Sequence, residues 1–208
     1  MIPTDVPTEI KDIESYFADR FGPISSNAYC ELVPSTPLIT VRRTERSPKQ
    51  PNTVLFTCGM STNSMAETEI APGAPYISFA ELFLELPPAW DPHADITNPL
   101  NAWPIVVLRE IAQSPHLENR NIGGPISVYC YDHPIIPNTR FSGFLLIQDH
   151  VLKLRSKDIS LLRLVPLYPE EIDWFQEEGF VPLMQAFDRS AIAFCFDPRR
   201  MNTALVRK

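Results

Sequence analysis

Proline is the residue that most limits how this chain can fold. The sequence holds 22 prolines among 208 residues but only 7 glycines, and this proline share is roughly twice the average. Proline fixes φ and has no N–H, so it is disfavoured inside helices and central strands. Because the prolines are dispersed, we interpret them as loop and helix-start residues. This distribution excludes collagen-like and low-complexity classes.

The rest of the composition is that of a folded domain. Hydrophobic residues make up 44% and charged residues 21% of the chain, which is typical of a globular protein. The formal net charge of −7 argues against nucleic acid as a partner. The N-terminus has no signal-peptide pattern, and the apolar runs are too short to span a membrane. We expect a cytoplasmic protein that binds neither nucleic acid nor membrane.

The sequence carries no recognisable site for a metal or a cofactor. The four cysteines, Cys30, Cys58, Cys130 and Cys195, are widely separated and match no ligand spacing. We interpret them as buried, reduced thiols. No glycine-rich phosphate-binding motif is present in the sequence. We therefore expect no metal and no cofactor.

Hydrophobic periodicity and turn residues predict an α+β fold. A helix is expected from Thr8 to about Asp19, and another within 98–113. Either Asn98-Pro99 or Trp103-Pro104 supplies the start signal of the second helix, and its regular part is expected to begin near Pro104. Val107, Leu108 and Ile111 form the expected core face of the second helix. Two more helices are predicted at 169–178 and 181–187. The predicted strands are 29–33, 38–43, 53–58, 77–86, 126–131, 141–148, 161–167 and 191–196. The hairpin-like runs of strands predict a mixed, largely antiparallel sheet with flanking helices, in a single domain over residues 1–208.

Two short segments offer a weak case for a hydrolase. Ser61 follows Gly59 and Met60 at a strand end and so resembles a nucleophile elbow, but that motif needs a second glycine where this chain has Asn63. We interpret Ser61 as a turn or capping residue. Asp91, His93 and Asp95 alternate in one loop, but three local ligands are a weak metal signal without a fourth. A solvated loop explains them better.

The clearest charge feature is a long stretch without basic residues. Between Gln50 and Leu108 there is no Lys or Arg. The acidic residues of this stretch are Glu67, Glu69, Glu81, Glu85, Asp91 and Asp95. Chance clustering on a solvated face is one interpretation. The other is a negative surface that contacts and orients a basic protein partner. Because Glu81 and Glu85 are four apart in a predicted strand, they are expected to share one face.

Several segments together resemble the suppressor of fused domain family. Residues 53–65 are similar to that family's strand followed by a Gly59-Met60-Ser61 turn and a nearby Met65. Residues 80–90 resemble its Glu-Leu-x-Leu-x-Leu-Pro strand, closed by Trp90. Trp103-Pro104 begins a similar helix, and residues 123–134 and 164–187 also fit. The best-matching part is about 53–190, and the order and spacing of the pieces make the set fairly specific.

The resemblance implies a domain that acts through protein–protein contact, without catalysis or cofactor. The animal members bind a transcription-factor peptide in a cleft between this domain and a further C-terminal one, and we do not expect that two-domain cleft here. Stand-alone members are typically bacterial and are associated with immunity proteins that neutralise polymorphic toxins. The matched residues also have structural explanations: Gly59 permits a tight turn, and Met60, Met65, Trp90 and Trp103 are expected to pack in the core.

We predict a non-enzymatic immunity protein that binds a toxin domain with a basic surface. A nuclease toxin would offer such a surface, because it must itself hold phosphates. One alternative is a hydrolase that uses Ser61 or the loop of Asp91, His93 and Asp95. Another is a regulatory interaction module with no toxin involved.

Overall fold

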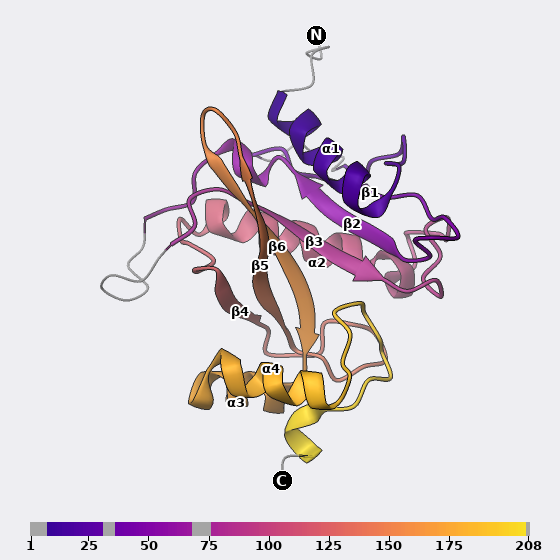
Figure 1. Ribbon diagram of the computed structural model, residues 1–208, viewed down its shortest axis with the longest axis vertical. Coiled ribbons are helices and arrows are strands. Elements are labelled where there is room, and N and C mark those ends of the chain that lie inside the picture. The colour runs from indigo at the N-terminus through magenta and orange to yellow at the C-terminus, as the bar shows by residue number, and fades with distance from the viewer. Residues whose placement is uncertain (1–7, 31–35, 68–75, 207–208) are drawn as a thin grey trace.

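The computed structural model describes residues 8–30, 36–67 and 76–206, which form a six-stranded sheet with helices on both faces (Figure 1). The strands are β1 (Thr40–Arg43), β2 (Thr53–Cys58), β3 (Ala80–Leu86), β4 (Ile126–Cys130), β5 (Gly143–Lys153) and β6 (Asp158–Leu167). The helices are α1 (Thr8–Phe21), α2 (Pro99–Leu117), α3 (Pro169–Glu178) and α4 (Phe180–Arg189), with 3-10 turns η1 (Met60–Thr62) and η2 (Thr203–Val206). The predicted α+β class is confirmed.

The sheet consists of two antiparallel halves that meet at a parallel pair. Its strand order is β1-β2-β3-β6-β5-β4. Strands β1 to β3 are antiparallel neighbours, and so are β4 to β6. The parallel pair β3–β6 joins the halves, with Ala80 opposite Ser160 and Phe83 opposite Arg163. A parallel pair needs a crossover connection, and here α2, β4 and β5 supply it. The sheet is therefore mixed but largely antiparallel, as predicted.

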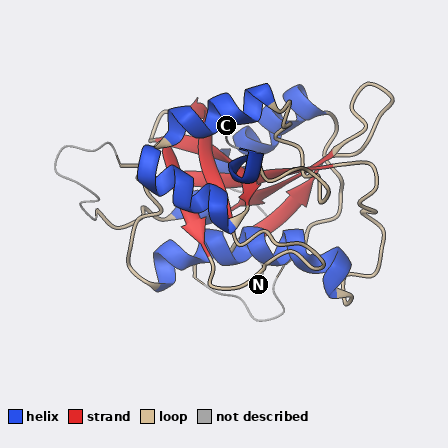
Figure 2. Cartoon of the chain, turned by 90° about the horizontal axis from the view of Figure 1, so that it is seen from below, coloured by secondary structure: helices blue, strands red, loops and turns tan. Residues whose placement is uncertain are grey.

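Helices cover both faces of the central strands. Helix α2 packs on one face, where Leu82 and Leu162 lie in the largest core cluster. Helix α1 packs on the other face, and Phe17 stacks on Phe56 with their ring centroids 4.1 Å apart. Helices α3 and α4 cover the far end of this second face, against Val165 and its neighbours. Figure 2 shows the sheet between the two helical layers. Because both faces are covered, β2 and β3 are almost entirely buried.

Helix α2 begins at the earlier of the two predicted start signals, and it is regular before Pro104. The side chain of Asn98 accepts a hydrogen bond from the backbone N–H of Leu100 at 3.0 Å, and Pro99 occupies the first helical position. The expected start near Pro104 is wrong: the helix continues through Pro104 despite the lost hydrogen bond and steric clash of an internal proline, and Asn98 caps its free end. The predicted core face is confirmed by the burial of Val107, Leu108 and Ile111.

Two predicted strands are reduced to single bridges. Tyr29 pairs with Val41 through one bridge, and the predicted strand 29–33 runs on into residues outside the described ones. The predicted strand 191–196 makes one bridge, between Cys195 and Glu85. The apolar residues of this last segment serve the core instead, since Phe196 packs against Trp103. No helix in the described ranges is both long and apolar enough to cross a membrane.

Candidate partner-binding surfaces

The acidic residues of the stretch without Lys or Arg do not form one surface. Glu81 and Glu85 share a sheet face, as the strand alternation predicts, but neither presents a free charge. Glu81 is 0% exposed. Glu85 accepts hydrogen bonds from Arg163 Nη1 at 2.9 Å and from Asn52 Nδ2 at 2.8 Å. The prediction of an exposed acidic face at Glu81 is therefore wrong, because neighbouring protein encloses its carboxylate.

Three other members of the acidic set do reach solvent. Glu67, Asp91 and Asp95 are exposed, while Glu69 lies outside the described residues. Asp95 accepts hydrogen bonds from the backbone N–H of Thr97 at 2.9 Å and from its hydroxyl at 2.8 Å. These bonds, the backbone one first, lower the pKa of Asp95 and keep it ionised. The loop before α2 thus holds a fixed negative charge.

The same loop does not assemble a metal site. Asp91 Oδ1 accepts a hydrogen bond from the backbone N–H of His93 at 2.9 Å, and Asp95 uses both oxygens within its own turn. Among the residues that the structure describes, no group of three His, Cys, Asp or Glu could hold a metal ion. Local turn formation explains the alternation of Asp91, His93 and Asp95.

Glu81 instead organises the turn that carries the family resemblance. Its Oε1 accepts hydrogen bonds from the backbone N–H groups of Gly59 and Ser61, both at 3.0 Å, and from the Ser61 hydroxyl at 2.7 Å. Its Oε2 accepts one from the Thr57 hydroxyl at 2.6 Å. Burial raises the pKa of Glu81, and these donors act in the opposite direction. We call this arrangement the Glu81 site.

Two side chains from distant elements hold the outer carbonyl groups of the same turn. Lys157 Nζ, at the tip of the β5–β6 hairpin, donates to the carbonyl oxygen of Ser61 at 2.6 Å and pairs with Glu9 of α1 at 2.8 Å. His116 Nε2, near the end of α2, lies 3.1 Å from the carbonyl oxygen of Met60. The turn therefore joins both halves of the sheet to the helices on its two faces.

These contacts give Ser61 a structural role. Its side chain is buried, with 2% relative exposure, and its hydroxyl donates to Glu81. A nucleophilic serine needs a neighbouring base and access to substrate. Glu81 is occupied by further donors inside the protein. The geometry of Ser61 is that of a turn residue, as interpreted from the sequence.

The other motif residues belong to the core. Gly59 has φ of +114°, and a Cβ there would lie 2.1 Å from the carbonyl oxygen of Leu38. Only glycine fits such a position. Met60, Met65, Trp90 and Trp103 all lie in the largest core cluster, so their predicted packing role is confirmed. Pro104 is buried within α2.

The cysteines are less buried than the sequence indicates. Cys58 is buried, Cys195 is half-buried, and Cys30 and Cys130 are exposed. The expectation of burial holds fully for Cys58 alone, because Cys130 lies on the outermost strand of the sheet. Burial raises the pKa of Cys195 to about 11.

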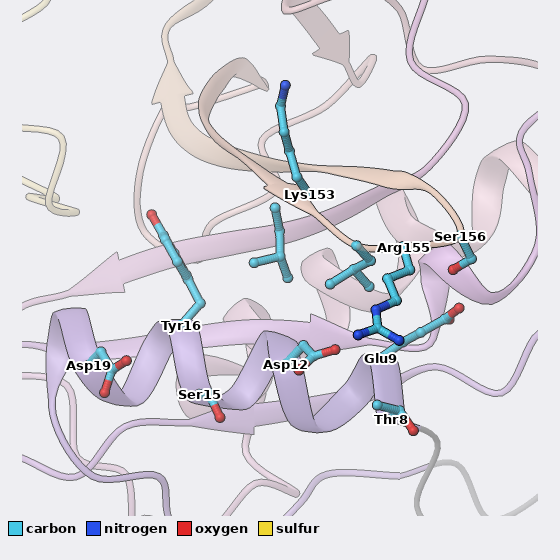
Figure 3. Close-up of a pocket in the computed structure, with 11 residues that line it drawn as sticks. Thr8, Glu9, Asp12, Ser15, Tyr16, Asp19, Lys153, Arg155 and Ser156 are labelled. Carbon is cyan, nitrogen blue, oxygen red and sulfur yellow. The ribbon is translucent and has the colours of Figure 1, made fainter.

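A surface hollow lies between α1 and the tip of the β5–β6 hairpin and has a volume of about 770 Å³. Its helical wall carries Glu9, Asp12 and Asp19, and its hairpin wall carries Lys153 and Arg155. In Figure 3, Arg155 extends toward the helix, whereas Lys153 points away from it. This charged groove presents both signs of charge.

A second hollow is mainly apolar and has a volume of about 360 Å³. We call it the α2 pocket. Its walls are the N-terminal half of α2 and the loop between β4 and β5. The residues that line it are Thr97, Pro99, Ala102, Trp103, Val106, Val107, Glu110, Tyr131, His133, Pro134, Ile135 and Pro137. The acidic loop that carries Asp95 leads directly into it.

Sequence reasoning missed one buried ion pair. Glu171, in the first turn of α3, is 0% exposed and accepts a hydrogen bond from Arg200 Nη1 at 2.8 Å. It also accepts from the backbone N–H of Thr203 at 2.9 Å. The pair fastens the C-terminal segment to α3. The same carboxylate accepts a hydrogen bond from the backbone N–H of Tyr168 at 3.1 Å, but no local pattern in the sequence indicates Arg200 as its distant partner.

Comparison with known proteins identifies the domain. A family model described as suppressor of fused protein (SUFU) matches residues 35–201. No curated protein sequence matches the chain. A crystal structure described as a putative SUFU homolog from Neisseria gonorrhoeae has a TM-score of 0.67 and 13% identity, with 95% of this chain and 98% of that chain covered.

Two further structures share the fold at low identity. The Sufu–Fu complex matches with a TM-score of 0.60 and 10% identity over 95% of this chain and 93% of that chain. Drosophila Suppressor of Fused matches with a TM-score of 0.63 and 10% identity over 95% of this chain. The present chain covers 51% of the Drosophila chain, so it corresponds to about half of that protein.

Proposed function

The chain belongs to the suppressor of fused family, and from this premise we propose that it acts by binding another protein. The observation that carries the proposal is the family match together with the likeness to a structure of a Sufu–Fu complex. The site geometry is compatible with this role, because Ser61 is buried in a structural hydrogen bond. In this proposal the protein catalyses no reaction and acts by contact between its surface and that of a partner.

The specific function that we propose is that of a cytoplasmic immunity protein. It would neutralise a polymorphic toxin by covering the toxin's functional surface. Two observations support this: the family resemblance includes such bacterial proteins, and the chain covers 98% of the Neisseria gonorrhoeae homolog. The exposed charges of Asp91 and Asp95 favour a toxin domain with a basic surface. A nuclease has such a surface because it binds phosphates.

Coexpression tests the immunity function directly. The toxin domain encoded next to this protein is expressed in a bacterial host, with and without the protein, and colony counts are compared. We expect growth to be restored and the two proteins to copurify. The Val181→Lys variant, changed at an exposed residue of α4, should protect as well as the wild type.

A regulatory module without a toxin is the second candidate, because one similar structure is described as a Sufu–Fu complex. Failure to restore growth, combined with no binding to the purified toxin domain, would contradict the immunity function. A regulatory partner would then be sought, and the binding role itself would remain open to test.

A further inference from the structure

The α2 pocket exposes more apolar surface than the fold requires. Val106 lines it and is 51% exposed, although it lies in the middle of a helix whose other face is buried. Two more large apolar residues are exposed in the segment that leads into the pocket, Ile96 at 48% and Leu100 at 50%. Single exposed apolar residues are ordinary, but a group around a hollow marks an interaction site.

The walls of the pocket suit a large apolar side chain. Trp103 and Tyr131 contribute aromatic surface, and Pro134 and Pro137 contribute rigid apolar surface. The volume of about 360 Å³ lies near the lower limit for ligand sites. Such a hollow has room for one large side chain and part of a second. Apolar anchors in pockets of this kind dominate the energetics of protein interfaces.

One buried polar atom in this wall has no partner within the described structure. The Tyr131 hydroxyl is buried and makes no hydrogen bond. Burial raises the pKa of Tyr131, and the charge of Glu110 raises it further, so the hydroxyl keeps its proton and can donate. An unpaired buried hydroxyl is unfavourable. Because this atom is not exposed to solvent, a docked segment gains its hydrogen bond only when the Tyr131 side chain turns toward the pocket.

The rim of the pocket is acidic. Glu110 lines it and is exposed. Asp132 lies between two lining residues, with a side chain 96% exposed, and approaches His133 Nδ1 at 2.5 Å. Asp95 is two residues before Thr97, which also lines the pocket. None of the described lining residues is Lys or Arg. The rim therefore attracts cations and repels anions.

We propose that the α2 pocket docks a segment of the protein partner in which one large apolar side chain is flanked by Lys or Arg. The apolar side chain enters between α2 and the loop 131–137, and the flanking cations pair with Glu110, Asp132 and Asp95. This inference rests on the proposed function as a binding module and names the surface that performs it. The charged groove beside α1 does not indicate whether its ligand is a cation or an anion, because its two walls carry opposite charges.

Peptide titration of the isotopically labelled protein tests the proposal without knowledge of the partner. The probes are three hexapeptides: Lys-Arg-Leu-Leu-Lys-Arg, its counterpart with glycines in place of the leucines, and its counterpart with glutamates in place of the cations. We expect the first peptide to shift the backbone amide resonances of Val106, Glu110 and Ile135 in NMR spectra. The other two peptides should bind at least about fivefold more weakly, because one lacks the apolar side chains and the other lacks the positive charges.

Two variants and two matched controls locate the site. Val106→Lys fills the apolar wall with a charge, and we expect it to weaken binding about tenfold. Glu110→Lys reverses the rim, and we expect about threefold weaker binding. The controls Val181→Lys and Glu177→Lys make the same changes at exposed positions of α4 and α3. Both controls should bind the peptide as the wild type does.

Several outcomes would overturn the pocket assignment. Equal binding of the glutamate peptide would show that charge plays no part. Shifts confined to the groove beside α1 would place the cations there. Concentration-dependent shifts of the pocket amides without peptide would show that a second copy of this chain is the occupant. None of these results depends on a toxin. The peptide experiments can therefore contradict the pocket assignment while the growth assay supports the immunity function, or support the pocket while the growth assay contradicts that function.

Discussion

The carboxylates of Glu81 and Asp95 belong to the same basic-free stretch, but they lie in opposite environments. Glu81 is fully buried and accepts hydrogen bonds from Thr57, Gly59 and Ser61. Asp95 is exposed and bonds within its own turn to Thr97. The Glu81 carboxylate stabilises the fold, whereas the charge of Asp95 faces solvent, where a partner can approach it. The comparison shows that acidic residues close together in the sequence do not have to form one exposed surface. Other elements of the fold decide which of them are buried.

The difference has a physical origin in what covers each residue. The sheet face that carries Glu81 and Glu85 also carries Phe83, which packs under α1. A carboxylate on such a face must find donors or lose its charge. Asp91, His93 and Asp95 of the other loop are exposed to solvent. Breaking the Glu81 site should therefore change stability, and changing Asp95 should change association.

Gly59→Val should have the largest effect on the Glu81 site. The new Cβ would meet the carbonyl oxygen of Leu38, and valine disfavours the φ of +114°. We expect a loss of about 3–5 kcal/mol in the free energy of unfolding, measured by urea denaturation. A matched change at Gly179, where a Cβ would meet nothing within 4 Å, should cost less. Equal losses at both glycines would contradict the close approach at Leu38.

Glu81→Ala should be the next most destabilising change. It leaves the Thr57 and Ser61 hydroxyls and the N–H groups of Gly59 and Ser61 without their acceptor. We expect a loss of about 3 kcal/mol. Glu81→Gln keeps one oxygen toward the turn and should lose only about 1 kcal/mol. If alanine is tolerated as well as glutamine in urea denaturation, the carboxylate does not organise the turn.

Ser61→Ala should cost less again. It removes one hydroxyl that donates to Glu81 but leaves the backbone N–H of Ser61 in place. We expect about 1 kcal/mol of destabilisation and full partner binding. Loss of function at unchanged thermal stability would return Ser61 to the list of candidate nucleophiles.

The pH dependence of the Glu81 site should be modest and has a definite sign. Burial raises the pKa of Glu81 above its ordinary value of 4.5. The folded chain then keeps a proton that the unfolded chain loses, so stability falls as pH rises from about 4.5 through the folded pKa. We expect the free energy of unfolding of the wild type to decrease relative to Glu81→Gln over this window. An increase would show that the donors outweigh burial.

Charge reversal in the exposed loop should change stability less than the changes at Gly59 and Glu81. The double variant Asp91→Lys/Asp95→Lys loses the exposed turn hydrogen bonds from His93 and Thr97 and should cost about 1–2 kcal/mol. With a basic toxin domain, we expect the association rate to fall about tenfold at low salt, and the dissociation rate to change far less. Stopped-flow measurements between about 50 and 500 mM salt test this. A rate that is independent of salt would refute steering by these charges.

Local patterns in the sequence determined the elements that depend on a few neighbouring residues. Strand β2 and helix α3 occur with the predicted bounds. The alternation in β3 separates Glu81 from Leu82, as predicted, because successive side chains of a strand point to opposite faces. The family resemblance also came from the sequence, since Gly59-Met60-Ser61 and Trp103-Pro104 lie in recognisable order. These signals act within one turn or one strand.

Only the tertiary structure decided which charged residues are buried. Glu81 meets its donors across 20 to 24 residues of sequence, and Glu171 meets Arg200 across 29. The α2 pocket likewise joins Val106 to a loop beyond Tyr131. The energy of a charged or apolar side chain depends on its loss of contact with water. That loss is fixed by elements distant in the chain, and no local pattern records which of them will cover a given face.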